Sequence, residues 1–172
     1  MKIHDEGNIL KYAFENFQTP PETWTGWLTS PDTDQFPAGA YAWDWTIQTS
    51  QGMEHWQGDV TASQQGEEQF LIHGTLQLAN GIGNYQLTIS DENPLSVDAL
   101  QPALLVGGKA NLSFTDANGV SYQGVWTVTG VGTSCLWVDE NANGVMDSGE
   151  TVDINYDNST GTWKSVTAQT AQ

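Results

Sequence analysis

The stretch that decides the fold is Tyr41-Ala42-Trp43-Asp44-Trp45-Thr46-Ile47-Gln48, in which large apolar side chains alternate with small or polar ones. Successive side chains of a β-strand point to opposite faces, so this period of two predicts a strand with one apolar face and one wet face. Such strands are typical of antiparallel sheets that pack one side on a core. The stretch therefore predicts an antiparallel β protein.

The same alternation continues toward the C-terminus. It recurs over residues 69–78, 84–90, 110–115 and 120–129, with turn sequences at Ser50-Gln51-Gly52, Asn80-Gly81, Asp116-Ala117-Asn118-Gly119 and Asp157-Asn158-Ser159. Turns of Asn, Asp, Ser and Gly join antiparallel strands. The spacing predicts an all-β fold, an antiparallel β-sandwich or closed β-barrel of about nine or ten short strands.

The N-terminal segment has a different composition. Four prolines fall between residues 19 and 39, together with Trp24 and Trp27, and proline disfavours regular structure inside an element. Residues 1–18 fit a helix or a strand equally well. We expect an irregular Pro/Trp-containing arm over residues 1–38, packed on the domain or donated to a neighbour, and a single β domain over residues 39–172.

Charge limits the classes of partner. The 172 residues carry 21 acids against four lysines and no arginine, a net charge of −17. Proteins bind nucleic acids and anionic membrane surfaces through clustered Lys and Arg side chains. We therefore expect neither a nucleic acid nor an anionic membrane surface as a partner. No apolar run approaches the length of a membrane span, so we expect no membrane insertion, and no signal peptide is visible at the N-terminus. Cations, neutral ligands or basic partners remain.

Residues 139–150 form the strongest motif. They read Asp139-Glu140-Asn141-Ala142-Asn143-Gly144-Val145-Met146-Asp147-Ser148-Gly149-Glu150, which fits the calcium-loop pattern D-x-[DN]-x-[DN]-G-x5-E at every specified position. The predicted ligands are the side chains of Asp139, Asn141, Asn143, Asp147 and Glu150 and the backbone carbonyl of Val145. Hard oxygen donors in this number favour Ca²⁺ over Mg²⁺.

The twelve residues resemble the calcium-binding loop of the EF-hand family, and the resemblance covers no more of the chain. The flanking segments, Thr133 to Val138 and Val152 to Tyr156, are β-like, so the paired helices of a calcium sensor are missing. The resemblance implies an EF-hand-type loop placed in a β-hairpin, as in calcium-dependent extracellular bacterial proteins, with a structural Ca²⁺. It also implies that Met146 packs inward.

The wet faces carry Thr, Gln, Asn and Ser far more than Lys or Glu, which suits hydrogen bonding to sugars or lateral assembly. Tryptophans outside the predicted core are candidate stacking platforms for a ligand: Trp24, Trp27, Trp56 and Trp163.

No P-loop, dinucleotide-binding fingerprint or nucleophile elbow occurs, so we assign no catalytic residue. The chain has many carboxylates, so a pair of catalytic carboxylates of the glycosidase type stays an alternative, but the sequence does not indicate which residues would form it.

Three hypotheses follow. The first is a calcium-stabilised, non-enzymatic module, extracellular or at the cell surface, that binds neutral glycans or mediates adhesion. The second is a structural subunit that forms a homo-oligomer or polymer by strand addition. The third is a small lipocalin-like barrel that acts on, or carries, an apolar ligand.

Overall fold

The computed structural model describes residues 1–5, 7, 9–31, 38–98, 100–101, 104–157, 160 and 162–166, without the side chains of Trp163 and Val166. This part of the chain contains strands and turns and no helix, so the all-β prediction is confirmed. The strands are β1 (Lys2–Asp5), β2 (Ile9–Thr19), β3 (Glu22–Pro31), β4 (Gly39–Thr49), β5 (Gly52–Gln65), β6 (Gln69–Ala79), β7 (Gly83–Ile89), β8 (Leu95–Asp98), β9 (Leu105–Gly107), β10 (Lys109–Asp116), β11 (Ser121–Gly130), β12 (Thr133–Asp139), β13 (Thr151–Asp157) and β14 (Thr162–Val166).

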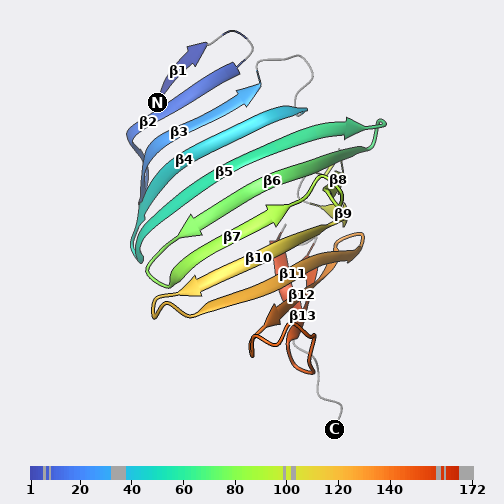
Figure 1. Cartoon of the computed structure of the whole chain (residues 1–172). Coiled ribbons are helices and arrows are strands. Elements are labelled where there is room, and N and C mark those ends of the chain that lie inside the picture. Colours follow the sequence, from blue (N-terminus) through green and yellow to red (C-terminus); the bar gives the residue numbers. More distant parts are fainter. Residues whose placement is uncertain are drawn as a thin grey trace.

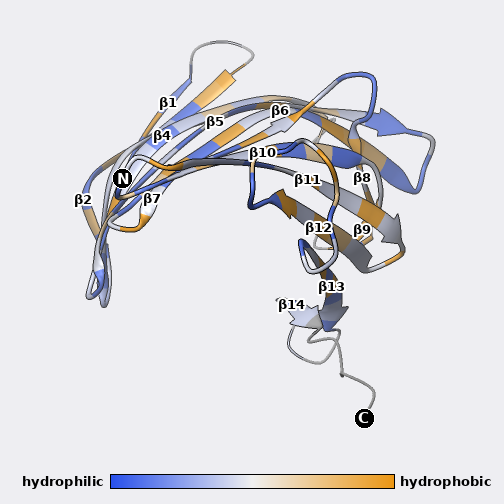
Figure 2. Cartoon of the chain, turned by 60° about the horizontal axis from the view of Figure 1, so that its bottom comes forward, coloured by the Kyte–Doolittle hydropathy of each residue, from blue (hydrophilic) through white to orange (hydrophobic). Residues whose placement is uncertain are grey.

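All strands belong to one antiparallel sheet, and most of them follow one another in chain order (Figure 1). The order runs from β1 through β7 to β10 and on to β14, while β8 and β9 lie off this path. Figure 2 shows the sheet curving into an open arch, with β13 and β14 below it. The sheet is not closed into a barrel, so the closed-barrel alternative is wrong. The strands are also more numerous than the nine or ten expected, and those that the sequence pattern did not identify include β1, β3, β8 and β9.

The expectation of an irregular N-terminal arm is also wrong. Strands β1, β2 and β3 continue the sheet, with β2 paired to β3 and β3 to β4 within the same chain. The prolines do not interrupt these strands because Pro20 and Pro21 lie at the β2–β3 turn and Pro31 ends β3. Proline is tolerated at such positions, where no ladder hydrogen bond is lost. Pro37 lies outside the described residues.

The hydrophobic core lies where β8 and β9 fold against β10 and β11. Strand β6 pairs with β7 along one half and with β8 along the other, so β8 continues the edge that β7 begins. The N–H of Gly132 donates to the carbonyl of Leu105 (3.0 Å), which ties β9 to the end of β11. The buried cluster consists of Ile89, Leu95, Val97, Leu105, Ala110 and Val128, with Ile72, Leu76, Leu87 and Trp126 packed against it.

The pairing register separates the sheet into two chemically different faces. We call the apolar face the side that carries Trp43, Trp45 and the buried cluster, and the polar face the side that carries Asp44 and Gln57. On the apolar face, Gly58 leaves room for the indole of Trp43, because an added Cβ would collide with that ring. The predicted alternation of Tyr41, Trp43, Trp45 and Ile47 is thereby confirmed.

Candidate functional site

A row of polar side chains crosses the polar face from β3 to β12. Each member is the direct cross-strand partner of the next, so all of them point to the same side of the sheet. The members of this central row are Trp27, Asp44, Gln57, Gln77, Gln86, Ser113, Gln123 and Asp139. Carboxamides, a hydroxyl and two carboxylates therefore line up over eight strands, with one tryptophan at the end of the row.

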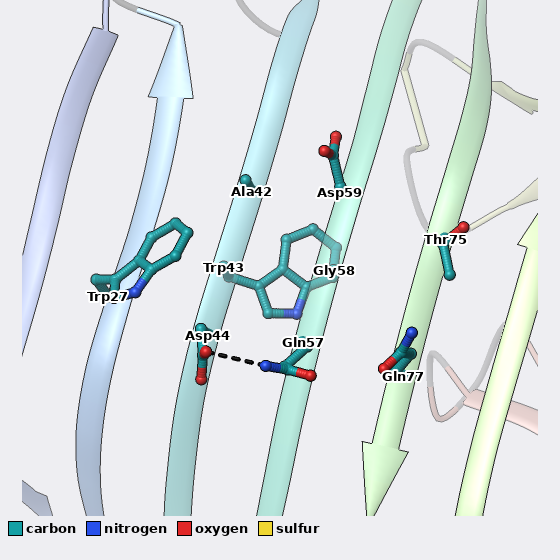
Figure 3. A pocket seen from close by; sticks show the side chains of 9 residues that line it. All are labelled: Trp27, Ala42, Trp43, Asp44, Gln57, Gly58, Asp59, Thr75 and Gln77. Atoms are coloured by element: carbon teal, nitrogen blue, oxygen red, sulfur yellow. Dashed lines mark hydrogen bonds between the residues drawn. The ribbon is translucent and has the colours of Figure 1, made fainter.

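Two adjoining depressions lie along this row. The first, of about 310 Å³, is lined by Trp27, Ala42, Trp43, Asp44, Gln57, Gly58, Asp59, Thr75 and Gln77 (Figure 3). The second, of about 320 Å³, is lined by His55, Gln57, Gln77, Leu78, Ala79, Asn84, Tyr85, Gln86, Ser113 and Thr115. Gln57 and Gln77 line both, so the depressions form one trough across β3–β7 and β10.

Trp27 stands at the β3 end of the trough, and Figure 3 shows its indole beside β4. The ammonium group of Lys11, on β2, lies 5.2 Å from the centroid of the Trp27 ring. A cation over an aromatic face is attracted by the ring quadrupole. Lys11 therefore orients the indole, which is half-buried and remains part of the trough lining.

Asp44 is held by two neighbouring side chains of the trough. Its Oδ1 accepts a hydrogen bond from Nε2 of His55 (2.7 Å), and its Oδ2 accepts one from Nε2 of Gln57 (2.9 Å). The bond from His55, and then the bond from Gln57, lower the pKa of Asp44 below its usual value. The result is a fixed, ionised acceptor in the floor of the trough, with 40% of the side chain exposed.

The four candidate stacking tryptophans do not lie on one surface. Trp24 lies on the apolar face, where its ring meets Trp45 edge-on with centroids 5.8 Å apart. Trp56 lies on the same face, opposite Trp45, and its indole N–H donates to Glu54 (3.0 Å). The side chain of Trp163 lies outside the described residues. Among the described tryptophans of this set, Trp27 alone reaches the trough.

The predicted calcium loop connects β12 to β13. Asp139 is the last residue of β12, and Glu150 immediately precedes β13. The N–H of Val138 donates to the carbonyl of Glu150 (3.0 Å), which closes the neck of the loop. Both predicted flanking strands are confirmed. The loop is thus held at its two ends by a β-hairpin.

The loop is curled by its own acceptor groups. Oδ2 of Asp139 accepts the N–H of Gly144 (2.8 Å), and Oδ1 of Asn143 accepts the N–H of Val145 (2.6 Å). Gly144 has a φ of 74°, a left-handed conformation that favours glycine and makes the sharp turn possible. The amides of Asn141 and Asn143 donate to Asp147 (2.8 and 2.7 Å) and lower its pKa.

Two of the predicted ligands are buried. Asp139 and Glu150 are 7% and 8% exposed, and Glu150 accepts hydrogen bonds from the indole of Trp137 and from the N–H groups of Glu140 and Asp147. Buried carboxylates are costly unless they are paired, hydrogen-bonded or coordinated to a metal. Both are held here by N–H donors, with no Lys, Arg or His contact among the described residues.

The donor set of the loop fits a hard cation, with three carboxylates, two side-chain amides and one backbone carbonyl of Val145. Within the described residues, no three His, Cys, Asp or Glu side chains are arranged to hold a metal ion. Calcium binding therefore remains a prediction. Met146 is 60% exposed, so the expectation that it packs inward is wrong: the hairpin offers no helix face against which it could pack.

The sequence interpretation missed the pairing of Asp44 with His55. By register, His55 lies on the polar face and Glu54 on the apolar face. The signal for the missed pair was the short turn at Ser50-Gln51, because pairing Thr49 with Gly52 fixes the register and sets Asp44 diagonally opposite His55. His73 likewise contacts Asp91, a turn residue that alternation does not place.

Comparisons with protein-family models, with curated proteins and with solved structures found no significant match for the chain. No helix that could span a membrane occurs in the part of the chain that the structure describes. The trough and the loop are therefore the features of the chain that bear on its function.

Proposed function

We propose that the chain is a calcium-stabilised, non-enzymatic β module that binds neutral glycans at or outside the cell surface. The observation that carries the proposal is the trough on the polar face. It places the indole of Trp27 beside a row of amide, hydroxyl and carboxylate groups that reaches across six paired strands.

The chemistry of the trough favours sugars. Carboxamides donate and accept hydrogen bonds, and a carboxylate accepts two or more, so together they match the hydroxyl groups of a sugar ring. An indole provides the apolar plane on which the C–H face of a sugar can stack. The trough contains Asp44 and Asp59 and no lysine or arginine among its lining residues, which disfavours anionic polysaccharides.

The length of the trough favours a chain of sugars over a single one. The central row advances by one strand at each step, and neighbouring strands lie about 4.8 Å apart. The row from Trp27 to Ser113 therefore measures roughly 24 Å. A linear oligosaccharide can lie along such a row and contact several carboxamides in turn.

Calcium has a structural role in this proposal. Asp139, Asn141, Asn143, Asp147, Glu150 and the carbonyl of Val145 would hold the ion, whose charge would offset the repulsion among the acids of the loop. With two neutral amides among its donors, the loop suits affinities of roughly 10⁻⁶ to 10⁻³ M, a range that includes extracellular calcium sites. This supports an extracellular or surface location.

A second candidate function is assembly by strand addition. Strands β1 and β14 stand at the two ends of the strand order, and all four residues of β1 are exposed. An edge strand offers unpaired backbone groups to a neighbouring chain. The lipocalin-like hypothesis requires a closed barrel, which this sheet does not form.

The glycan proposal is tested by isothermal titration against a panel of soluble neutral oligosaccharides, in buffer containing calcium. Trp27→Ala should weaken binding of the best oligosaccharide at least about tenfold, because the stacking contact is lost. Gln77→Ala, which removes an amide shared by both depressions, should weaken it less.

Two control variants separate the trough from general folding effects. Trp24→Ala removes a tryptophan of the same strand on the opposite face, and Gln48→Ala removes an exposed amide of the polar face outside both depressions. Both should bind like the unmodified chain, and the melting temperature of each variant reports its folding. Absence of binding across the panel, or equal losses in Trp24→Ala and Trp27→Ala, would contradict the proposal.

A further inference from the structure

The aromatic side chains in the described part of the chain are poorly buried. The buried apolar residues of the described chain are Ile47, Ala62, Ile89, Leu95, Val97, Leu105, Ala110 and Val128, and none of them is aromatic. Aromatic side chains are usually highly buried and supply much of the stability of a core. On the apolar face of this sheet most of them are left half-covered.

These half-buried side chains form a continuous strip. One row of the apolar face runs across eight strands, and we call it the aromatic row: Phe14, Gly26, Trp45, Trp56, Leu78, Tyr85, Phe114 and Tyr122. Tyr85, Phe114 and Tyr122 stack in succession, with ring centroids 4.4 and 5.8 Å apart. A parallel row adds Tyr12, Leu28 and Trp43 on its flank.

Charge is absent from the middle of this face. By register, the acids on the apolar side of the paired strands are Asp5, Glu22, Glu54 and Asp116, and each lies at or near a strand end. The four lysines fall on the polar side of their strands. In a chain of net charge −17, the apolar face is the surface on which two copies can meet without bringing many acids together.

The size of the face approaches what a stable dimer needs. Its eight strands, β2 to β7 with β10 and β11, are spaced about 4.8 Å apart, and three side-chain rows span about 14 to 20 Å. The projected area is roughly 600 Å². A stable interface buries about 800 Å² from each partner.

From these observations we infer that the apolar face is covered by the apolar face of a second copy of this chain. In such a dimer the aromatic rows of the two curved sheets would face each other and form a shared core, as the inner faces of a β-sandwich do. The inference does not depend on glycan binding. The trough lies on the opposite side of the sheet, so a dimer would present two troughs outward and raise avidity for a polymeric ligand.

The test is sedimentation velocity of the full chain over a range of concentrations, with calcium and without glycan. The unmodified chain should sediment as a dimer. Tyr85→Glu and Leu78→Glu place an acid in the aromatic row, and each should weaken dimerisation at least about 100-fold, because two unpaired charges would be buried. The control is Gln86→Glu, which adds the same charge on the same strand but on the polar face, and it should remain dimeric.

Several outcomes would overturn the inference. The first is that the unmodified chain is monomeric at every concentration. The second is that the control Gln86→Glu dissociates as much as Tyr85→Glu and Leu78→Glu. The third is that the unmodified chain is a monomer that instead binds neutral phosphatidylcholine vesicles. Far-UV circular dichroism identifies any variant that fails to fold, and the concentration series of the unmodified chain then decides alone. An unmodified chain that is monomeric at every concentration but still binds oligosaccharide would contradict this inference and leave the proposed function standing.

Discussion

Asp44 shows how a single residue links the sheet to its chemistry. The alternation of apolar and polar residues placed Asp44 correctly on the polar face. Its hydrogen-bond partners, however, come from the neighbouring strand. His55 and Gln57 reach its two carboxylate oxygens only because the β4–β5 turn sets their register. The same holds for Trp27, whose place in the trough depends on pairing with Asp44. Residue type and face follow from local sequence, whereas contacts between strands follow from register.

The lowered pKa of Asp44 predicts a pH dependence of stability. Because its folded pKa lies below the unfolded value, the contribution of Asp44 is fully present above the unfolded pKa and is lost as pH falls through the folded pKa. At neutral pH, Asp44→Asn should melt about 1–2 °C below the unmodified chain, a small effect because the group is exposed to screening. The difference should shrink progressively below about pH 4. Calorimetric scans from pH 7 to pH 2.5 measure it.

Asp59→Asn provides the matched control, since it removes another carboxylate of the polar face without breaking the contacts of Asp44. It should leave the neutral-pH melting temperature almost unchanged. A difference between Asp44→Asn and the unmodified chain that persists at pH 2.5 would show that packing, and not the ionised carboxylate, is responsible.

At the scale of elements, the sequence predicted strands well where apolar and polar residues alternate and poorly where that pattern is short or broken by proline. The β4–β5 and β12–β13 hairpins follow the alternation and turn residues that predicted them. Strands β8 and β9 are only four and three residues long, too short for a period to emerge. Strand β3 was missed because Pro21 and Pro31 flank it, although neither lies in its interior.

The β12–β13 hairpin carries the calcium prediction. Calcium at about 100 times its Kd should stabilise the folded chain by about 2.7 kcal/mol, a rise in melting temperature of roughly 5–10 °C. Glu150→Gln should abolish most of this rise, because the closing carboxylate is lost. Melting curves in chelator, in calcium and in magnesium provide the measurement, and magnesium should have the weaker effect.

Glu140→Gln is the control for the same loop, since it removes one acid at the second position, which supplies no ligand in the motif. It should keep the response to calcium. Two results would contradict the calcium prediction: a melting temperature that does not change with calcium, or an equal loss of the calcium-induced rise in Glu140→Gln and Glu150→Gln. Either result would mean that the loop is an acidic turn without a calcium site.

At the scale of the whole molecule, the strands form one open sheet that is not closed into a barrel, an arrangement that is consistent with the β-sandwich class. Alternation shows that one face of each strand is apolar, but it does not show what covers that face. A sandwich formed within one chain and a sandwich formed between two copies give the same sequence pattern. The distinction lies in long-range pairing, here the uninterrupted run of neighbouring strands from β1 to β7 and from β10 to β14.

The same architecture predicts an uneven distribution of stability. The buried cluster lies among β6 to β11, whereas β1 is a four-residue edge strand whose residues are all exposed. Local opening costs least where few apolar contacts and many exposed hydrogen bonds occur. Native-state hydrogen exchange should therefore show the slowest amides in β7, β10 and β11 and the fastest in β1, with at least about a 100-fold difference in protection. Uniform protection from β1 to β11 would instead mean that the sheet opens as a single cooperative unit and that its edge is as firmly held as its core.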